Sequence, residues 1–363
     1  MINRLFLLFK FNMQENAASV RKFVAFLTVF CAILSGCAII NDFGDYTSKN
    51  EVSLENVLKV HFIDVGQGDC IFVQSENTNM LVDAGTSESA NDICGYLDSL
   101  GIKKIDYFVG THPHEDHLGG AAAVILNYDV KTVYMTEHPS SSFFYEKLLD
   151  ALIRRNMTVN VPKTGCIYKA EGFEFEFLSP EIDFGNENDN SIVMRIDYGE
   201  TSILLMGDAE KNTEEYLLEN KKNVKADILK IGHHGSRNGS TTKFLNAVKP
   251  RAAVIQCGID NSYGHPHKEA IERLAKFGVQ IFRCDESGSV VLMSDGENVF
   301  SENGEKIKEN TVQVEIKYIG NKKSKKYHGE DCPSLPSEKN SIIFTSEDEA
   351  IIRGYSPCGS CRP

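Results

Sequence analysis

Apolar runs of strand length alternate with longer segments of helical periodicity through residues 57–300. The first two runs are separated by Gly66-Gln67-Gly68-Asp69, a sequence typical of a turn, so the first strands are predicted to be antiparallel. Phe173, Phe175 and Phe177 alternate with glutamates, which predicts a strand with one buried face. The predicted strands include 57–65, 70–75, 79–82, 172–179 and 192–198.

The predicted helices carry apolar residues at three- and four-residue spacing, with polar residues between them. Their alternation with the strands indicates an α/β fold, and the region is long enough for one large domain with a substantial core. The helices are expected at 90–100, 118–127, 143–156, 210–219, 241–248 and 269–274.

The first part of the chain has the pattern of an export signal. Arg21 and Lys22 precede an apolar stretch over 23–34, which is short for a membrane span and typical of a signal peptide. The following Ser35-Gly36-Cys37 resembles the end of a bacterial lipobox, in which the cysteine is acylated. We therefore expect a signal peptide over 1–37, a lipid anchor on Cys37 and a tether over 38–56.

This interpretation places the protein outside the cytoplasm, anchored to the cell membrane as a lipoprotein. The alternative is an ordinary secretory signal or an uncleaved anchor. Met13 is an alternative to Met1 as the expected start of translation.

The segment 111–117, Thr-His-Pro-His-Glu-Asp-His, holds three histidines and an aspartate. A short apolar run precedes it and a helix start follows, so the cluster lies on a strand-to-helix loop, where functional groups are usually displayed. Imidazole nitrogen and carboxylate oxygen are ligands that zinc and similar divalent cations prefer. We expect His112 and His114 to face one ion, and Asp116 and His117 to face a neighbouring one.

Three further predicted strands end in acidic or imidazole side chains. Asp83 ends one strand, Asp208 ends another, and the pair His233 and His234 follows a third. Separate strands deliver such side chains to one edge of a sheet. A carboxylate there is well placed to bridge two cations about 3.5–4 Å apart.

Together these motifs resemble the metallo-β-lactamase superfamily. Within it, the chain looks most like the hydrolase domain of ComEC-type competence DNA-uptake proteins. The resemblance implies an α/β fold in the form of an αββα four-layer sandwich over 57–300, with two divalent cations, zinc or manganese. The superfamily motifs fall on His112, His114, Asp116, His117, Asp83, Asp208 and the pair His233-His234, and the subfamily likeness rests on 62–69, 207–210, 232–236 and 263–267.

The resemblance also implies roles for individual residues. Asp83 is expected to orient a ligand histidine, and His234 to be the ligand of the histidine pair. His233 would contact substrate or protonate the leaving group, or else support a ligand. His265 or His267 would lie near the substrate, with His265 preferred, unless these histidines only stabilise their turn.

The chain departs from the superfamily pattern at one ligand of the first metal. Many members place a third histidine between the main motif and the bridging aspartate, where this chain carries Asn186-Glu187-Asn188-Asp189-Asn190. Asp189 or Asn190 is expected to substitute through oxygen or through water. An oxygen ligand would hold the first metal more weakly and make manganese as suitable as zinc.

The end of the chain is predicted to be a separate module. A polar linker over 301–312 leads to residues 313–363, where His328, Cys332, Cys358 and Cys361 have the spacing of a tetrahedral zinc site. The segment resembles the Ada-type zinc-binding module of bacterial DNA-repair proteins. It has His328 in place of that family's first cysteine, which argues against methyl transfer. The alternative is a disulfide among the three cysteines.

The predicted reaction is metal-assisted hydrolysis. A water shared by the two ions, its pKa lowered from about 15.7 towards 7, would attack phosphorus or a carbonyl carbon, and Asp116 would take part as a metal ligand. The most specific hypothesis is a phosphodiesterase or nuclease acting on DNA at the cell surface. Hydrolysis of phosphocholine, a cyclic nucleotide or a lactone, and DNA binding without catalysis, are the alternatives.

The charge of the chain does not favour nucleic acid as a partner. A net charge of −13 repels DNA at long range. The run Lys322-Lys323-Ser324-Lys325-Lys326 is the clearest basic segment, either a contact for phosphates or a solvated turn. The sequence does not indicate any protein partner.

Overall fold

The computed structural model describes residues 56–361. The predicted signal peptide, nearly all of the predicted tether and the lipid anchor on Cys37 lie outside the described residues. Within residues 56–361, no helix is both long and apolar enough to cross a membrane.

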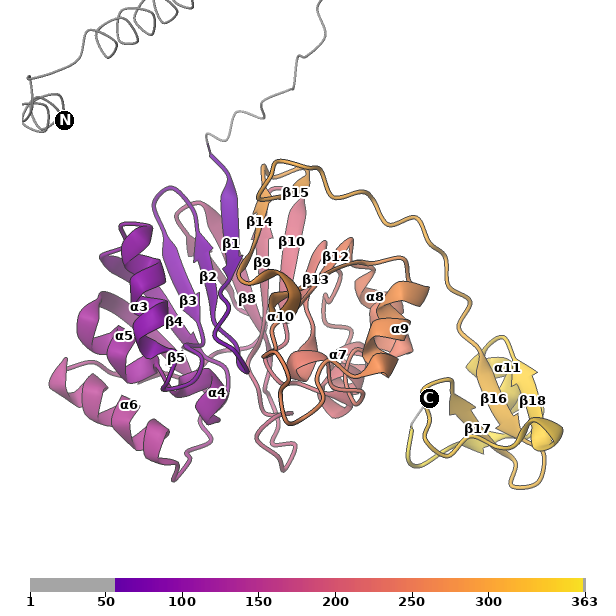
Figure 1. The fold of residues 1–363 in the computed structure, drawn as a ribbon. Coiled ribbons are helices and arrows are strands. Elements are labelled where there is room, and N and C mark those ends of the chain that lie inside the picture. Colours follow the sequence, from indigo (N-terminus) through magenta and orange to yellow (C-terminus); the bar gives the residue numbers. More distant parts are fainter. Residues whose placement is uncertain (1–55, 362–363) are drawn as a thin grey trace, which may run out of the picture. The chain divides into compact units, whose positions relative to one another are not determined.

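Two β-sheets lie face to face in the larger domain, whose last strand ends at Ser301 (Figure 1). The first sheet has the order β15 (Val299–Ser301), β14 (Val290–Ser294), β1 (Leu58–Phe62), β2 (Ile71–Gln74), β3 (Asn79–Val82), β4 (Lys104–Gly110), β5 (Asp129–Met135) and β6 (Val159–Asn160). The second has the order β13 (Gln280–Arg283), β12 (Ala252–Ile255), β11 (Ile228–Lys230), β10 (Thr201–Leu205), β9 (Val193–Tyr198), β8 (Phe173–Ser179) and β7 (Ile167–Ala170).

The space between the sheets is filled by side chains that alternate along the strands. In β2, Ile71 packs between the sheets while its neighbour Phe72 faces the helices. Phe173, Phe175 and Phe177 of β8 are all buried between the sheets, as their alternation with glutamates predicted. The predicted antiparallel start is also confirmed, because β1 pairs with β2 in antiparallel register.

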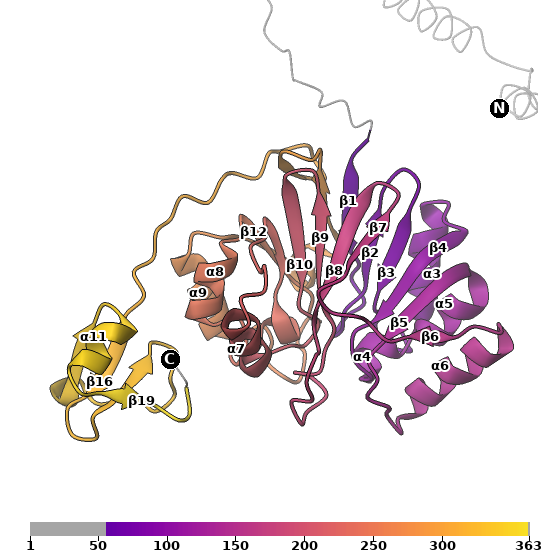
Figure 2. The same cartoon turned by 180° about the vertical axis from the view of Figure 1, so that it is seen from behind.

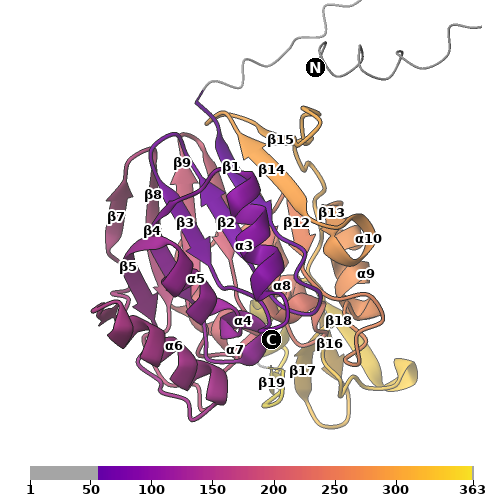
Figure 3. The same cartoon turned by 60° about the vertical axis from the view of Figure 1, so that its left-hand side comes forward.

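Helices cover the outer face of each sheet, which confirms the αββα sandwich (Figures 1 and 2). Figure 3 shows α3, α5 and α6 lying over the strands of the first sheet. The helices of the first sheet are α3 (Ala90–Ser99), α4 (Glu115–Leu118), α5 (Ala121–Asn127) and α6 (Phe143–Arg154). Those of the second half are α7 (Lys211–Glu219), α8 (Thr242–Val248), α9 (Lys268–Lys276) and the short α10 (Cys284–Ser287).

The prediction of one helix over 118–127 is wrong at its start, because two glycines separate α4 from α5. A Cβ atom on Gly119 would lie 2.3 Å from the backbone nitrogen of Ser87, and one on Gly120 would lie 2.4 Å from the backbone oxygen of Ala84. The loop after β3 therefore packs directly against this break. The backbone nitrogen of Ala84 donates to the oxygen of His117 at 2.7 Å, so the contact also fixes the histidine segment.

The C-terminal module has a sheet of its own. Its core is small and consists mainly of Tyr327, Phe344, Ala350 and Tyr355. The sheet has the order β18 (Ser341–Phe344), β16 (Tyr318–Asn321), β17 (Lys326–Gly329) and β19 (Ser356–Pro357), and α11 (Glu347–Ile352) packs on it.

Candidate metal centre

Four strand ends bring the predicted metal-binding side chains together. Asp83 follows β3, the segment 111–117 follows β4, Asp208 lies beyond β10, and the pair His233-His234 lies beyond β11. Strands β3 and β4 are parallel neighbours in one sheet, and β10 and β11 are parallel neighbours in the other. Their carboxyl ends therefore present these side chains at one edge of the sandwich.

Asp208 lies at the centre of the cluster, and its Oδ1 atom faces two buried histidines. This oxygen is 3.2 Å from Nε2 of His117 and 3.3 Å from Nε2 of His234. Oδ2 of Asp116 is 3.2 Å from the same His234 nitrogen. Ligand atoms around one zinc ion lie about 3.3 Å apart, because each bond is about 2.0–2.2 Å long in tetrahedral geometry. His117, His234 and Asp208 therefore group as ligands of one cation, and Asp116 lies beside His234 of the same group.

Buried polar atoms without hydrogen-bond partners support this fit. Nε2 of His117, Nε2 of His234 and Oδ1 of Asp208 are all buried and lack such a partner. An unpaired buried polar atom costs about 1–3 kcal/mol, so native proteins rarely leave three together. A divalent cation among them would satisfy all three atoms.

The ligand set predicted for the first metal lies on the other side of Asp208, so the group around His117 and His234 is the second set. Nε2 of His112 is 3.6 Å from Oδ2 of Asp208 and 3.0 Å from Nδ1 of His114. The far nitrogen of His114 is 2.9 Å from Oε2 of Glu187, which holds the ring in place. Asp208 thus directs one oxygen to each ligand set, as a bridging carboxylate does.

Asp83 orients His117, as the resemblance implied. Oδ2 of Asp83 lies 2.8 Å from Nδ1 of His117, while its Oδ1 accepts a hydrogen bond from the backbone nitrogen of Thr111 at 2.8 Å. Asp83 adopts a positive φ of 59°. This carboxylate fixes which imidazole nitrogen is left to face the metal position.

Asp69 has the corresponding position behind His234, a role that the sequence analysis missed. Its Oδ1 is 3.2 Å from Nδ1 of His234, and its Oδ2 is 2.7 Å from Nζ of the buried Lys230. Nδ1 of His234 also lies 3.0 Å from the backbone oxygen of Gln256. Asp69 is close enough to the metal-binding atoms to be considered a ligand. However, it contacts the His234 nitrogen that faces away from Asp208, so we assign it to orientation.

The expectation that Asp189 or Asn190 completes the first ligand set is wrong. Oδ1 of Asp189 accepts from the backbone nitrogens of Glu210 and Thr213, at 3.0 and 3.3 Å, at the start of α7. The side chain of Asn190 bonds to Asp183 and to the backbone of the same loop. Both side chains are therefore engaged in local structure, away from the metal-binding atoms.

His233 lies beside the ligand sets, at the more exposed side of the cluster. Its Nδ1 is 2.7 Å from Oε1 of Glu210, which also accepts from Ser236 at 2.8 Å. Its Nε2 lies 3.7 Å from Oδ2 of Asp208. Both His233 and His234 have positive φ angles, 47° and 53°, and this tight turn directs the two rings to different places.

Of the two later histidines, His265 is the one near the cluster. Its ring centroid lies 5.3 Å from that of His233 and 6.1 Å from that of His234, and its Nδ1 is buried without a hydrogen-bond partner. His267 lies next to α9, and its Nδ1 accepts from the backbone nitrogen of Arg237 at 3.1 Å. His265 was the preferred residue on sequence grounds, and it is the one that lies beside His233 and His234.

Opposite charges dominate the electrostatics of the cluster. Burial raises the pKa of Asp208, but His234 and His117 lower it more, and the resulting pKa lies well below the usual range. Burial lowers the pKa of His117 and His234, but the surrounding carboxylates together raise it more, Asp208 first among them, and both pKa values end well above the usual range. The carboxylate is therefore held ionised, the form that binds metal, while a cation would displace a proton from each of the two histidines.

Comparison with known families agrees with this geometry. Residues 63–259 match the model of the metallo-beta-lactamase superfamily, which is more than half of the chain. The chain belongs to this superfamily.

The curated relatives of this superfamily member include a competence protein. It is 30% identical over 251 residues to ComE operon protein 3 of Bacillus subtilis and 31% identical over 252 residues to competence protein ComA of Neisseria gonorrhoeae. These matches cover 64% and 68% of this chain but only 32% and 34% of the relatives. The chain thus spans about a third of their length. The predicted likeness to ComEC-type proteins is confirmed.

Among solved structures, the fold is similar to that of the metallo-beta-lactamase fold protein YhfI from Bacillus subtilis, with 14% sequence identity and a TM-score of 0.46. That match covers 66% of this chain and 100% of YhfI.

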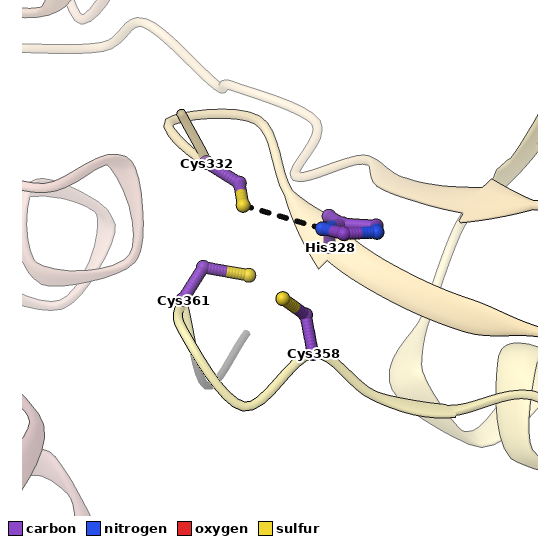
Figure 4. Close-up of side chains that lie close together, drawn as sticks. All are labelled: His328, Cys332, Cys358 and Cys361. Carbon is purple, nitrogen blue, oxygen red and sulfur yellow. Dashed lines mark hydrogen bonds between the residues drawn. The ribbon is translucent and has the colours of Figure 1, made fainter. Parts of the chain in front are cut away.

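Outside the metallo-beta-lactamase domain, a second metal-binding group lies in the C-terminal module. The side chains of His328, Cys332, Cys358 and Cys361 point toward one another, and their ligand atoms all lie within 4.8 Å of each other (Figure 4). The three cysteines are free thiols, and Nδ1 of His328 is 3.2 Å from the sulfur of Cys332. Residues 309–363 match the metal-binding domain of Ada. These observations support the predicted structural zinc.

Proposed function

We propose that this protein is an extracytoplasmic, metal-dependent phosphodiesterase that cleaves DNA. The proposal rests on the position of Asp208 between two ligand sets. Its Oδ1 faces His117 and His234, and its Oδ2 faces His112. When bound, two divalent cations supply a water activated at neutral pH and absorb the negative charge that develops on phosphate. The competence proteins among the relatives favour DNA as the substrate.

The chain's own residues would orient a phosphodiester at the exposed side of the centre. The ring centroids of His233 and His265 lie 5.3 Å apart at the side of Asp208 where His233 is a quarter exposed. Glu210 fixes Nδ1 of His233, so Nε2 would be the nitrogen that donates to a phosphate oxygen or a leaving group. His265 would contact the phosphate through its unpaired Nδ1.

The basic run at the turn between β16 and β17 is a second proposed contact for DNA. Lys322 and Lys323 are exposed, and Nζ of Lys325 lies 4.6 Å from the ring centroid of Tyr355. This run would bind phosphates without reading bases. It would offset part of the repulsion that follows from the net charge of −13.

The proposed activity is tested with the purified full chain, incubated with single- and double-stranded DNA and with bis-p-nitrophenyl phosphate in the presence of Mn²⁺ or Zn²⁺. The variant Asp116→Ala/His117→Ala should lose cleavage because two metal ligands are missing. The matched control is His138→Ala, which removes a half-buried histidine outside the ligand sets and should retain activity.

The outcome also separates the alternative substrates. Cleavage of DNA that is lost in the double variant supports the proposal. Cleavage of the small diester alone contradicts DNA as substrate and favours phosphocholine or a cyclic nucleotide. No cleavage of either DNA or the small diester contradicts the phosphodiesterase proposal and favours a lactone as substrate. DNA binding without turnover at full metal occupancy favours a non-catalytic DNA-binding lipoprotein.

The proposed location is tested separately through Cys37. A lipid anchor on this residue should place the wild-type chain in the membrane fraction and incorporate labelled palmitate. Cys37→Ser should remove the label and release the protein from membranes. Equal labelling of both forms would contradict the lipoprotein proposal.

A further inference from the structure

The first ligand set is incomplete with the residues considered so far. The set consists of His112, His114 and Asp208, when the acidic, histidine and cysteine side chains of the described residues are considered. Zinc takes four ligands and manganese commonly six, and the loop expected to supply another has Asp189 and Asn190 engaged elsewhere.

Asn188 on the same loop has a buried oxygen atom that lacks a partner. Its Oδ1 is buried and accepts no hydrogen bond, although its Nδ2 lies 3.5 Å from each ring nitrogen of His233. The preceding residue, Glu187, contacts the far nitrogen of His114. Asn188 is therefore next in the chain to a residue that contacts a first-site ligand, and its side chain contacts His233, whose Nε2 is 3.7 Å from Oδ2 of Asp208.

Leaving a buried amide oxygen without a hydrogen bond costs about 1–3 kcal/mol. A cation bound at this oxygen would remove that cost. Amide oxygens bind hard divalent cations. We propose that Oδ1 of Asn188 is a ligand of the first cation, in the place where many superfamily members have a histidine.

This assignment makes the two cation sites unequal. Besides the shared Asp208, the second site has the charged Asp116 with His117 and His234, whereas the first has two neutral imidazoles and a neutral amide. Affinity falls with fewer charged ligands, so the first cation binds more weakly. Because oxygen replaces nitrogen, the first site also discriminates less against Mn²⁺ in favour of Zn²⁺.

The test measures how many Mn²⁺ ions bind and with what affinities, and it needs no substrate. The full chain is stripped with chelator, the C-terminal site is refilled with one equivalent of Zn²⁺, and Mn²⁺ is titrated while free Mn²⁺ is followed by electron paramagnetic resonance. The wild type should bind two Mn²⁺ ions with different affinities. Asn188→Ala should weaken the weaker site at least about tenfold and leave the tighter site unchanged.

Two further variants sharpen the assignment. Asn188→Asp keeps an oxygen at the same place and adds charge, so it should restore or tighten the weaker site. Asn188→His should raise the preference of the weaker site for Zn²⁺ over Mn²⁺. Circular dichroism of each variant confirms that the fold is retained.

Unchanged Mn²⁺ affinities in Asn188→Ala, with no tightening in Asn188→Asp, would overturn the proposal and leave Asn188 as a support for His233. The inference rests on the dinuclear centre of the proposed function but not on its substrate. A chain that binds two cations as predicted but cleaves no DNA would refute the nuclease and leave the Asn188 assignment intact.

Discussion

Lys230 and Asp69 form an ion pair that is entirely buried beneath the metal centre. Both side chains are 0% exposed, and their charged atoms are 2.7 Å apart. Removing both charges from water is costly, and the pair persists because each charge compensates the other. Asp69 also contacts His234, so the lysine indirectly sets the position of a metal ligand.

Lys230→Met should therefore lower the free energy of unfolding by about 3–5 kcal/mol, because Asp69 would remain buried without its partner. The control is Lys104→Met, which breaks a pair whose lysine is 47% exposed and should change the free energy by less than about 1 kcal/mol. Urea denaturation of both variants measures the difference. A loss below 1 kcal/mol in Lys230→Met would show that the buried pair does not stabilise this fold.

His61 of β1 gives a pH dependence that is separate from metal binding. Burial lowers its pKa from 6.5 to about 4, with a further contribution from Lys59. Protons therefore bind His61 more tightly in the unfolded chain than in the folded one. Above pH 6.5 this histidine costs no stability, whereas by pH 4 it lowers the free energy of unfolding by up to about 3 kcal/mol. His61→Phe should lose less stability than the wild type as pH falls from 7 to 4. Parallel stability profiles of the two proteins would contradict this assignment.

The roles of single residues could be predicted where the motif spacing is specific. Asp83, Asp208 and His234 occupy positions that their motifs implied. Asp69 was missed because its contact with Lys230 joins residues of different sheets, which no local pattern reveals. Asp189 and Asn190 were misassigned because the local turn decides which side chain of the loop faces the centre.

At the scale of elements, the glycine pair between α4 and α5 fixes the histidine segment to the loop after β3. A Cβ on Gly119 would meet backbone atoms of Ser87 and Glu115 at 2.3 and 2.5 Å, and backbone atoms cannot move aside easily. The amphipathic pattern over 118–127 predicts one helix, since periodicity carries no information about a close neighbour.

Gly119→Ala should consequently lower the free energy of unfolding by about 1–3 kcal/mol and weaken metal binding, because the segment 111–117 must shift. Gly95→Ala is the matched control, since a Cβ there meets no atom within 4 Å and the residue lies inside α3. It should stabilise the protein by about 0.5–1 kcal/mol. Thermal unfolding of both variants measures the change in stability, and Mn²⁺ titration measures the change in metal affinity. Equal effects of the two substitutions would exclude the packing explanation.

At the scale of the whole molecule, the chain joins a metallo-beta-lactamase domain to an Ada-type zinc module. The sandwich could be predicted because its strands and helices alternate clearly and its motifs sit at strand ends. The module could be predicted from the spacing of one histidine and three cysteines. The substrate could not, since the same ligands serve phosphate esters and lactones alike.

The central claim is that this chain hydrolyses DNA at a centre where Asp208 would serve two cations. The most direct measurement is the initial rate of DNA cleavage as a function of Mn²⁺ bound per chain, with the C-terminal site already filled by zinc. The rate should stay low with the first equivalent, rise as the weaker site fills, and vanish in Asp208→Ala. A full rate with a single cation in the domain, or no cleavage with both sites filled, would contradict the account.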